Sequence, residues 1–190
     1  GFLCLTLYLL LSPRIGKKHS LSILVFGFSC VFLFSMSGVY HLLAMKSTAR
    51  HVLRILDYAG IYLLIAGSFT AIHQVLFRGF MRWGVLLFIW VLAINGITLG
   101  SIFFDSMPES LSLTFFLGMG WIGIITGVVL WKKRGLHFIR YFIFGGLSYT
   151  IGALLEFFRM PAIIPGVIGP HELFHIAVIL GTSFHWVFVL

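Results

Sequence analysis

Charged side chains are scarce in this sequence: Asp, Glu, Lys and Arg make up only 9% of its 190 residues, whereas hydrophobic residues make up 60%. A water-soluble domain of this size has no interior large enough to bury so much apolar surface, so the composition excludes that class. The apolar residues stand in long runs, and a helical run of roughly 20 residues spans the ~30 Å hydrocarbon core of a bilayer. The sequence therefore predicts an all-α integral membrane protein.

Cysteine is also rare. Cys4 and Cys30 are the two cysteines, both in apolar runs, and their spacing matches neither a disulfide framework nor a zinc knuckle. The formal net charge is +8, but the basic residues stand in short gaps between apolar runs, where membrane topology explains them more simply than nucleic acid. We therefore expect membrane lipids, and no nucleic acid, as partners.

Hydropathy divides the chain into seven apolar segments, without an internal repeat. Residues 1–12 are apolar but too short to span a bilayer; no initiator methionine precedes them and they lack the charged start of a signal peptide, so we expect a truncated first helix. The longer segments are 21–45, 55–77, 83–104, 110–131, 138–158 and 170–190. This pattern predicts a single domain, residues 1–190, folded as a seven-transmembrane-helix bundle.

Basic residues divide unequally between the two membrane faces. Because consecutive helices cross in opposite directions, the gaps after the first, third and fifth segments share one face and the other gaps share the second. The first face collects Arg14, Lys17, Lys18, Arg78, Arg82, Lys132, Lys133, Arg134 and Arg140, and the second collects Lys46, Arg50, Arg54 and Arg159. By the positive-inside rule, the first face is expected to be cytoplasmic.

Polar residues inside the apolar segments carry the functional signal, since an ionisable side chain near the bilayer centre costs a few kcal/mol unless it has a partner or a task. His41 lies near the end of the second segment, with Ser37 one turn earlier on the same helix face. Asp57 lies near the start of the third segment. The seventh begins with an HExxH pattern whose histidines, His171 and His175, also share one face. The alternating topology places all five near one membrane face.

Three histidines and a carboxylate at one depth match a catalytic zinc site. Neutral imidazoles of His41, His171 and His175, together with one water molecule, make the open tetrahedral coordination that catalytic Zn²⁺ uses. Asp57 is placed to hold that water and to accept its proton. A site of this kind hydrolyses amides or esters.

Each of these residues also has a structural interpretation. The histidine pair at 171 and 175 could be wet, interfacial side chains; Ser37 could donate to a carbonyl one turn earlier; and Asp57 could pair with Arg50 or Arg54. Glu156 and Arg159, three residues apart, predict a local ion pair.

The remaining histidines give weaker signals. His185 lies ten residues after the last histidine of the HExxH pattern, ~15 Å along the helix, so it belongs near the opposite face together with His73. These two could form a second polar site, but packed or interfacial positions are the simpler interpretation. We expect His19, His51 and His137 to lie in solvent-exposed loops.

Longer motifs surround the candidate residues. They are Ser37-Gly38-Val39-Tyr40-His41, then Leu56-Asp57 with residues 61–68, then Gly146, Tyr149, Thr150 and Gly152, and finally residues 171–175 with Gly181, His185 and Trp186. In these motifs, which span nearly the whole chain, the sequence resembles the haemolysin III group of the adiponectin receptor superfamily, the progestin and adipoQ receptors. The metal site of that superfamily also resembles the one in alkaline ceramidases.

The resemblance implies a seven-helix fold in which His41, His171 and His175 hold zinc and Asp57 contacts a bound water. Family members include receptors with hydrolase-like activity toward ceramide and bacterial members named for haemolysis, so we expect a multi-pass protein of a bacterial plasma membrane. His73 departs from the family, which more often has proline or a small residue there. Adiponectin receptors are described with the metal near the cytoplasmic face, whereas the basic residues here place that face outside.

The leading functional hypothesis is a membrane-embedded zinc hydrolase of lipid amide, ceramide-like, or ester bonds. Asp57 would accept the proton of the attacking water and Ser37 would orient the carbonyl or the water. The acyl chain would enter an apolar cavity among the helices from the bilayer.

Three other classes remain open. A membrane-embedded zinc protease would use Glu172 as its base, although this residue lies on a different helix face from the histidines. A receptor or membrane-homeostasis regulator would keep the metal as a structural link between helices. A haemolysin III-type cytolytic protein would permeabilise membranes even without His41.

Overall fold

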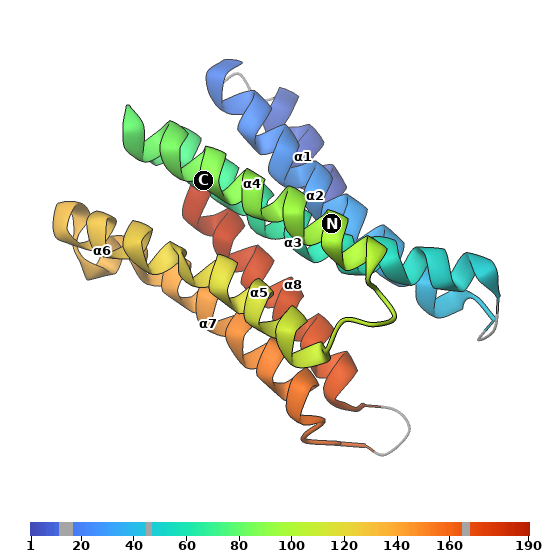
Figure 1. The fold of residues 1–190 in the computed structure, drawn as a ribbon. Coiled ribbons are helices and arrows are strands. Elements are labelled where there is room, and N and C mark those ends of the chain that lie inside the picture. Colours follow the sequence, from blue (N-terminus) through green and yellow to red (C-terminus); the bar gives the residue numbers. More distant parts are fainter. Residues whose placement is uncertain (12–16, 45–46, 165–167) are drawn as a thin grey trace. The chain divides into compact units, whose positions relative to one another are not determined.

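The computed structural model describes residues 1–11, 17–44, 47–164 and 168–190, except for the side chains of Lys17 and Lys18. Its helices are α1 Phe2–Leu11, α2 Lys17–Leu42, α3 Thr48–Leu76, α4 Phe80–Ile102, α5 Glu109–Trp121, α6 Gly123–Arg134, α7 Leu136–Phe158 and α8 Pro170–Val189 (Figure 1). Six helical segments are long and apolar enough to cross a membrane, with α5 and α6 together forming one, and α1 is a shorter apolar helix. In the described ranges the only β-structure is an isolated bridge between Ile164 and Ile168. The predicted all-α integral membrane fold with seven apolar helical segments is confirmed.

Two of the predicted helices differ most from the hydropathy prediction. Helix α3 begins at Thr48, several residues before the predicted start, because the Ser47 side chain accepts a hydrogen bond from the backbone N–H of Arg50 and caps a polar first turn. The predicted 110–131 helix is interrupted at Ile122, whose N–H is shared between the carbonyls of Gly118 and Gly120. Glycine weakens helices, so a glycine-rich stretch is where an interruption is least costly.

The prediction that His19, His51 and His137 lie in loops is wrong, because they lie within α2, α3 and α7. Each of these three helices begins before the apolar run from which its start was predicted, so the polar residues at its N-terminal end are helical too. The expectation that these histidines are exposed is confirmed.

The described residues divide into two compact units, Gly1–Met107 and Pro108–Leu190. In the first unit, α2 and α3 pack antiparallel through glycines. A Cβ on Gly60 would lie 3.1 Å from the Cα of Leu33, and one on Gly67 would lie 3.4 Å from the Cα of Phe26. Small residues seven apart allow this close backbone approach, which is how membrane helices gain packing energy.

Helix α3 also packs on α4 in the first unit. The rings of Tyr58 and Tyr62 lie against Gly100 and Gly96, and the Trp90 indole N–H donates to Thr70 Oγ1 at 3.0 Å. Helix α3 therefore contacts a neighbour on both sides, and it is more buried than the other candidate membrane-spanning helices.

The second unit is organised around the antiparallel pair α7 and α8. A Cβ on Gly145 would lie 3.1 Å from the carbonyl oxygen of Gly181, and one on Gly152 would lie 2.6 Å from Ala177 Cβ. Between these contacts, Tyr149 Oη and Thr182 Oγ1 share a hydrogen bond of 3.0 Å. The turn from α6 into α7 is made by Gly135 at φ 83°, a conformation that favours glycine.

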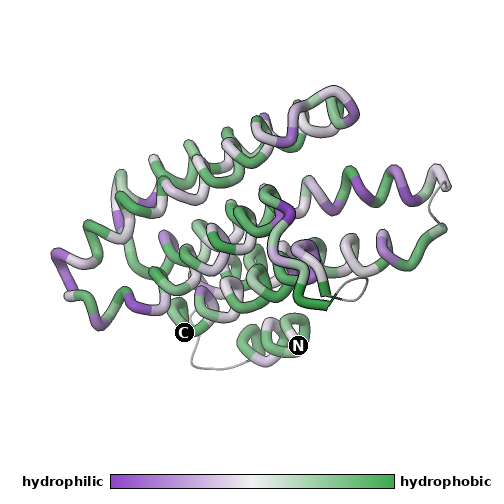
Figure 2. Tube along the Cα trace, turned by 90° about the horizontal axis from the view of Figure 1, so that it is seen from below, coloured by the Kyte–Doolittle hydropathy of each residue, from purple (hydrophilic) through white to green (hydrophobic). Residues whose placement is uncertain are grey.

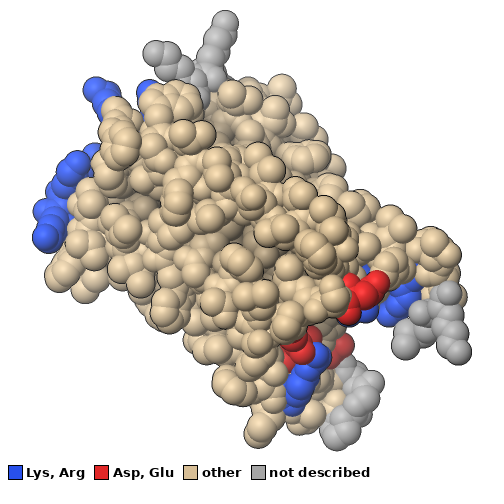
Figure 3. Space-filling view, viewed as in Figure 1, with Lys and Arg blue, Asp and Glu red and all other residues tan. Residues whose placement is uncertain are grey.

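Polar residues gather toward helix ends, while apolar residues cover the helix lengths (Figure 2). In the second unit, Lys132, Lys133 and Arg134 form the last turn of α6. Acidic side chains of this unit lie near a basic one at the end where α5 begins (Figure 3). The topology prediction also used Arg14 and Lys46, which lie outside the described residues.

Candidate metal centre

The first unit holds Ser37, His41 and Asp57 on its central helix pair. Ser37 is buried and His41 is exposed one turn later, in the last turn of α2. Asp57 is half-buried on α3, well inside the helix and not at its start as predicted. The glycine contacts fix the antiparallel register of α2 and α3, and the same register places Ser37 level with Asp57.

Arg50 secures the end of α2 that carries His41. Its Nη1 donates to the carbonyl of Leu43 at 2.6 Å and to that of Tyr40 at 3.3 Å, and its guanidinium lies 4.5 Å from the centre of the Tyr40 ring. The last carbonyls of a helix have no partner within it and carry partial negative charge, so a cation satisfies both needs. The Tyr40 ring in turn contacts the His41 ring, with centroids 4.6 Å apart.

The second unit brings His171 and His175 together in the first turns of α8. Their Nε2 atoms lie 3.0 Å apart, within hydrogen-bond distance, and both side chains are half-buried. Two nitrogens bound to one tetrahedral zinc ion at ~2.0–2.1 Å lie about 3.3–3.4 Å apart, within a few tenths of an ångström of the observed distance. The predicted convergence of the HExxH histidines on one face is present.

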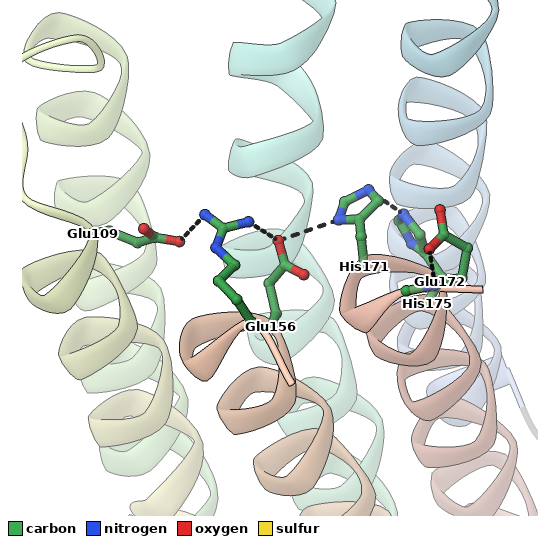
Figure 4. A network of polar contacts seen from close by, with 7 residues as sticks. Glu109, Glu156, His171, Glu172 and His175 are labelled. Atoms are coloured by element: carbon green, nitrogen blue, oxygen red, sulfur yellow. Dashed lines mark hydrogen bonds and ion pairs between the residues drawn. The ribbon is translucent and has the colours of Figure 1, made fainter. Parts of the chain in front are cut away.

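A carboxylate orients the first of these histidines. Glu156 Oε1, near the end of α7, lies 3.3 Å from His171 Nδ1 (Figure 4). A carboxylate accepts hydrogen bonds, so this contact favours a proton on Nδ1, and the neutral ring with its proton there has its lone pair on Nε2. This is the arrangement in which histidine binds zinc through Nε2 while an outer carboxylate fixes its ring.

The helix packing explains why Glu156 reaches α8. The contacts of Gly145 and Gly152 set the antiparallel register of α7 and α8. That register brings the last turn of α7 level with the first turn of α8, where His171 lies. The predicted ion pair of Glu156 with Arg159 is confirmed at 3.1 Å.

Glu172, the middle residue of HExxH, has another contact. Its Oε2 accepts the backbone N–H of Gly169 at 2.8 Å, so the side chain folds back over the start of α8 (Figure 4). Pro170 follows the cap. This is a helix-capping role, in agreement with its predicted position away from the histidine face.

Two further histidines are packed inside their units, as predicted. His73 is buried, stacks between Phe69 and Phe77, and has Nδ1 2.8 Å from the carbonyl oxygen of Met81. His185 is buried with its ring stacked on Phe142, at a centroid distance of 5.5 Å.

Sequence reasoning missed the contacts of Glu156 with α8 and of Arg50 with α2. The partners are 15 residues apart in the first case and seven to ten in the second. No local spacing rule reaches that far. The available signal for the first contact was Glu156 itself, an acidic residue near the end of the apolar segment that precedes the HExxH helix.

The sequence is similar to a protein family and to bacterial proteins. A family model described as haemolysin-III related matches residues 1–186. Hemolysin-3 of Bacillus cereus is 29% identical over 167 residues, which cover 87% of this chain and 72% of that protein. A Hemolysin-3 homolog of Bacillus subtilis (strain 168) is 32% identical over 139 residues, 73% of this chain and 64% of that protein.

Plant proteins are also similar. Heptahelical transmembrane protein ADIPOR3 of Oryza sativa subsp. japonica is 30% identical over 174 residues, 82% of this chain but only 42% of that protein. The chain thus spans less than two thirds of the length of the B. subtilis and rice relatives.

Proposed function

Because the chain belongs to the haemolysin-III related family, we propose that this multi-pass membrane protein binds zinc and hydrolyses a lipid amide or ester bond. The proposed ligands are His41, His171 and His175, and the proposed location is a bacterial plasma membrane. The observation that carries the proposal is the histidine pair of α8, whose Nε2 atoms lie 3.0 Å apart. The contact of Glu156 with His171 Nδ1 supports the proposal, because it favours the tautomer in which Nε2 is free to bind zinc.

The first unit contributes the groups that would act on the substrate. Asp57 is a half-buried carboxylate, placed by the α2–α3 register at the depth of Ser37. In our proposal Asp57 accepts a proton from the attacking water and returns it to the leaving amine or alcohol. The Ser37 hydroxyl donates a hydrogen bond to the carbonyl that is attacked.

Zinc held by the three histidines would supply a nucleophilic hydroxide at neutral pH and a positive charge beside the carbonyl oxygen. Residues of the chain would position and assist the metal. Glu156 orients His171, Arg50 fixes the end of α2 that carries His41, and Asp57 moves the proton. A lipid is the substrate class that fits a site borne on membrane-spanning helices, because its acyl chain is already dissolved in the bilayer.

Metal content tests the proposal. Protein purified in detergent without chelator is analysed by inductively coupled plasma mass spectrometry, as wild type and as His41→Ala, His171→Ala and His175→Ala variants. We expect about one zinc per chain in the wild type and its loss in each variant. His137→Ala removes an exposed histidine far along the chain from the predicted ligands and should retain the metal. A wild-type protein without stoichiometric zinc refutes the proposal.

Turnover is tested separately with short-chain fluorescent ceramide and ester substrates. Asp57→Asn should keep its zinc and lose activity by roughly 10²–10⁴-fold, as removal of a general base does. Glu172→Gln should keep both its zinc and its turnover, because the Glu172 side chain caps α8. Loss of turnover in the Glu172 variant alone would instead support protease-like chemistry.

Membrane lysis is a second candidate, favoured by the name Hemolysin-3 that the Bacillus cereus relative carries. A lytic chain should release dye from liposomes, and His41→Ala should release it equally well. Dye release that requires the histidine would link lysis to the metal, and no release would remove this candidate.

A further inference from the structure

A row of charged side chains leads from the start of α5 to His171 on α8. Glu109 Oε1, at the start of α5, lies 2.8 Å from Arg159 Nη2, and Arg159 Nη1 lies 3.1 Å from Glu156 Oε1. The same Glu156 oxygen meets His171 Nδ1 (Figure 4). Three helices of the second unit therefore meet through one arginine and two carboxylates at the start of α8.

The backbone of Arg159 supports a role for its side chain. This residue ends α7 in the left-handed conformation, with φ 55° and ψ 33°. Glycine commonly holds such a position, and any other residue there carries a cost in backbone strain. An arginine therefore occupies a position where glycine would be the more stable choice, and what it adds is the guanidinium between two carboxylates.

Stability alone is a weak explanation for the row. The side chains of Arg159 and Glu109 are 64% and 58% exposed, and exposed ion pairs contribute little to stability because water and salt screen them. That gain does no more than offset the backbone cost at Arg159. Glu156 is less exposed, at 24%, and it is the member that contacts the histidine.

We propose that Glu109, Arg159 and Glu156 form a positioning relay that fixes the ring and tautomer of His171 and thereby strengthens zinc binding. The inference rests on the proposed function, since it concerns the same metal. Arg159 clamps Glu156 Oε1 from one side, so this oxygen stays directed at Nδ1 and the ring turns its Nε2 toward His175. An outer carboxylate of this kind typically changes metal affinity by ~10–100-fold.

Zinc affinity measured by competition with a chromophoric chelator tests the relay in the full chain in detergent. Glu156→Leu, which has no acceptor, should bind zinc ~10–100-fold more weakly, and Glu156→Gln, which keeps a neutral acceptor, should lose less. Arg159→Gly should also bind zinc more weakly while its unfolding temperature stays equal or rises, because glycine relieves the backbone. That combination separates a positioning role from a structural one.

Glu172→Gln is the matched control, because it removes one negative charge beside the same histidines without touching the relay. It should bind zinc as the wild type does. Zinc binding by Glu156→Leu within about twofold of wild type, with stoichiometric zinc in the wild type, overturns the relay and leaves the proposed function intact.

A measurement on the metal-free protein separates failure of the relay from failure of the proposed function. Nitrogen-15 NMR of histidine-labelled protein, treated with chelator, reports which ring nitrogen of His171 is protonated. We expect a proton on Nδ1 in the wild type and a mixture of tautomers in Glu156→Leu. The same tautomer mixture in both proteins overturns the relay whatever the metal content. Absence of zinc from the wild type overturns the proposed function and, with it, the claim on affinity.

Discussion

The contact between α2 and α3 gives the sharpest structural prediction, because a single methyl group at Gly60 meets backbone. Its Cβ would lie 2.9 Å from Leu33 Cδ1, 3.1 Å from Leu33 Cα and 3.3 Å from Leu33 Cβ. The Cδ1 atom can rotate away, but the Cα moves only if the whole of α2 shifts by a few tenths of an ångström. Overpacking of this kind costs roughly 1–3 kcal/mol.

Gly60→Ala is therefore compared with Gly38→Ala, where a Cβ meets nothing within 4 Å. Both changes gain about 1 kcal/mol of helix propensity, so the difference between the variants isolates the overpacking. Using about 2–4 °C per kcal/mol for a chain of this length, Gly60→Ala should unfold some 2–12 °C below Gly38→Ala.

Cys30 provides the assay. It lies on α2 and is fully buried, whereas Cys4 is exposed. In a Cys4→Ser background, a thiol-reactive fluorophore should label Cys30 only as α2 separates from its neighbours on heating. Equal labelling midpoints for the two alanine variants would refute the reasoning, since they would show that α2 and α3 do not approach as closely as the structure indicates.

Three further predictions concern single contacts and the proposed metal. Arg50→Ala should lower the free energy of unfolding by about 1–2 kcal/mol, because the carbonyl of Leu43 loses its cap, and it should also weaken zinc binding through α2; chemical denaturation and chelator competition measure both effects. Tyr149→Phe should lower that free energy by only ~0.6 kcal/mol, as for other hydrogen bonds between membrane helices, and leave zinc affinity unchanged; an effect above 2 kcal/mol would contradict this. Chelator treatment should lower the unfolding temperature of the wild type and not that of His171→Ala, read in the same thermal scan.

Much of the fold follows from hydropathy, since a run of about twenty apolar residues is stable in a bilayer only when its backbone hydrogen bonds are satisfied within the run. The same reasoning misplaced the start of α3, because its first turns from Thr48 are polar and are held by the Ser47 cap. It also missed the interruption at Ile122, because hydropathy measures the apolar character of side chains and carries no information on the backbone freedom that glycines give a helix.

For the candidate site, the sequence by itself determined that His171 and His175 share a helix face, and that Ser37 and His41 do, because helical periodicity is local and fixed. Only the tertiary structure decided that Glu156 meets His171 and that Arg159 reaches Glu109, 50 residues away. Those contacts depend on the register in which α7 meets its neighbours. That register is set by how closely glycines such as Gly145 and Gly152 allow two backbones to approach, which is a property of two surfaces packed together and of neither segment alone.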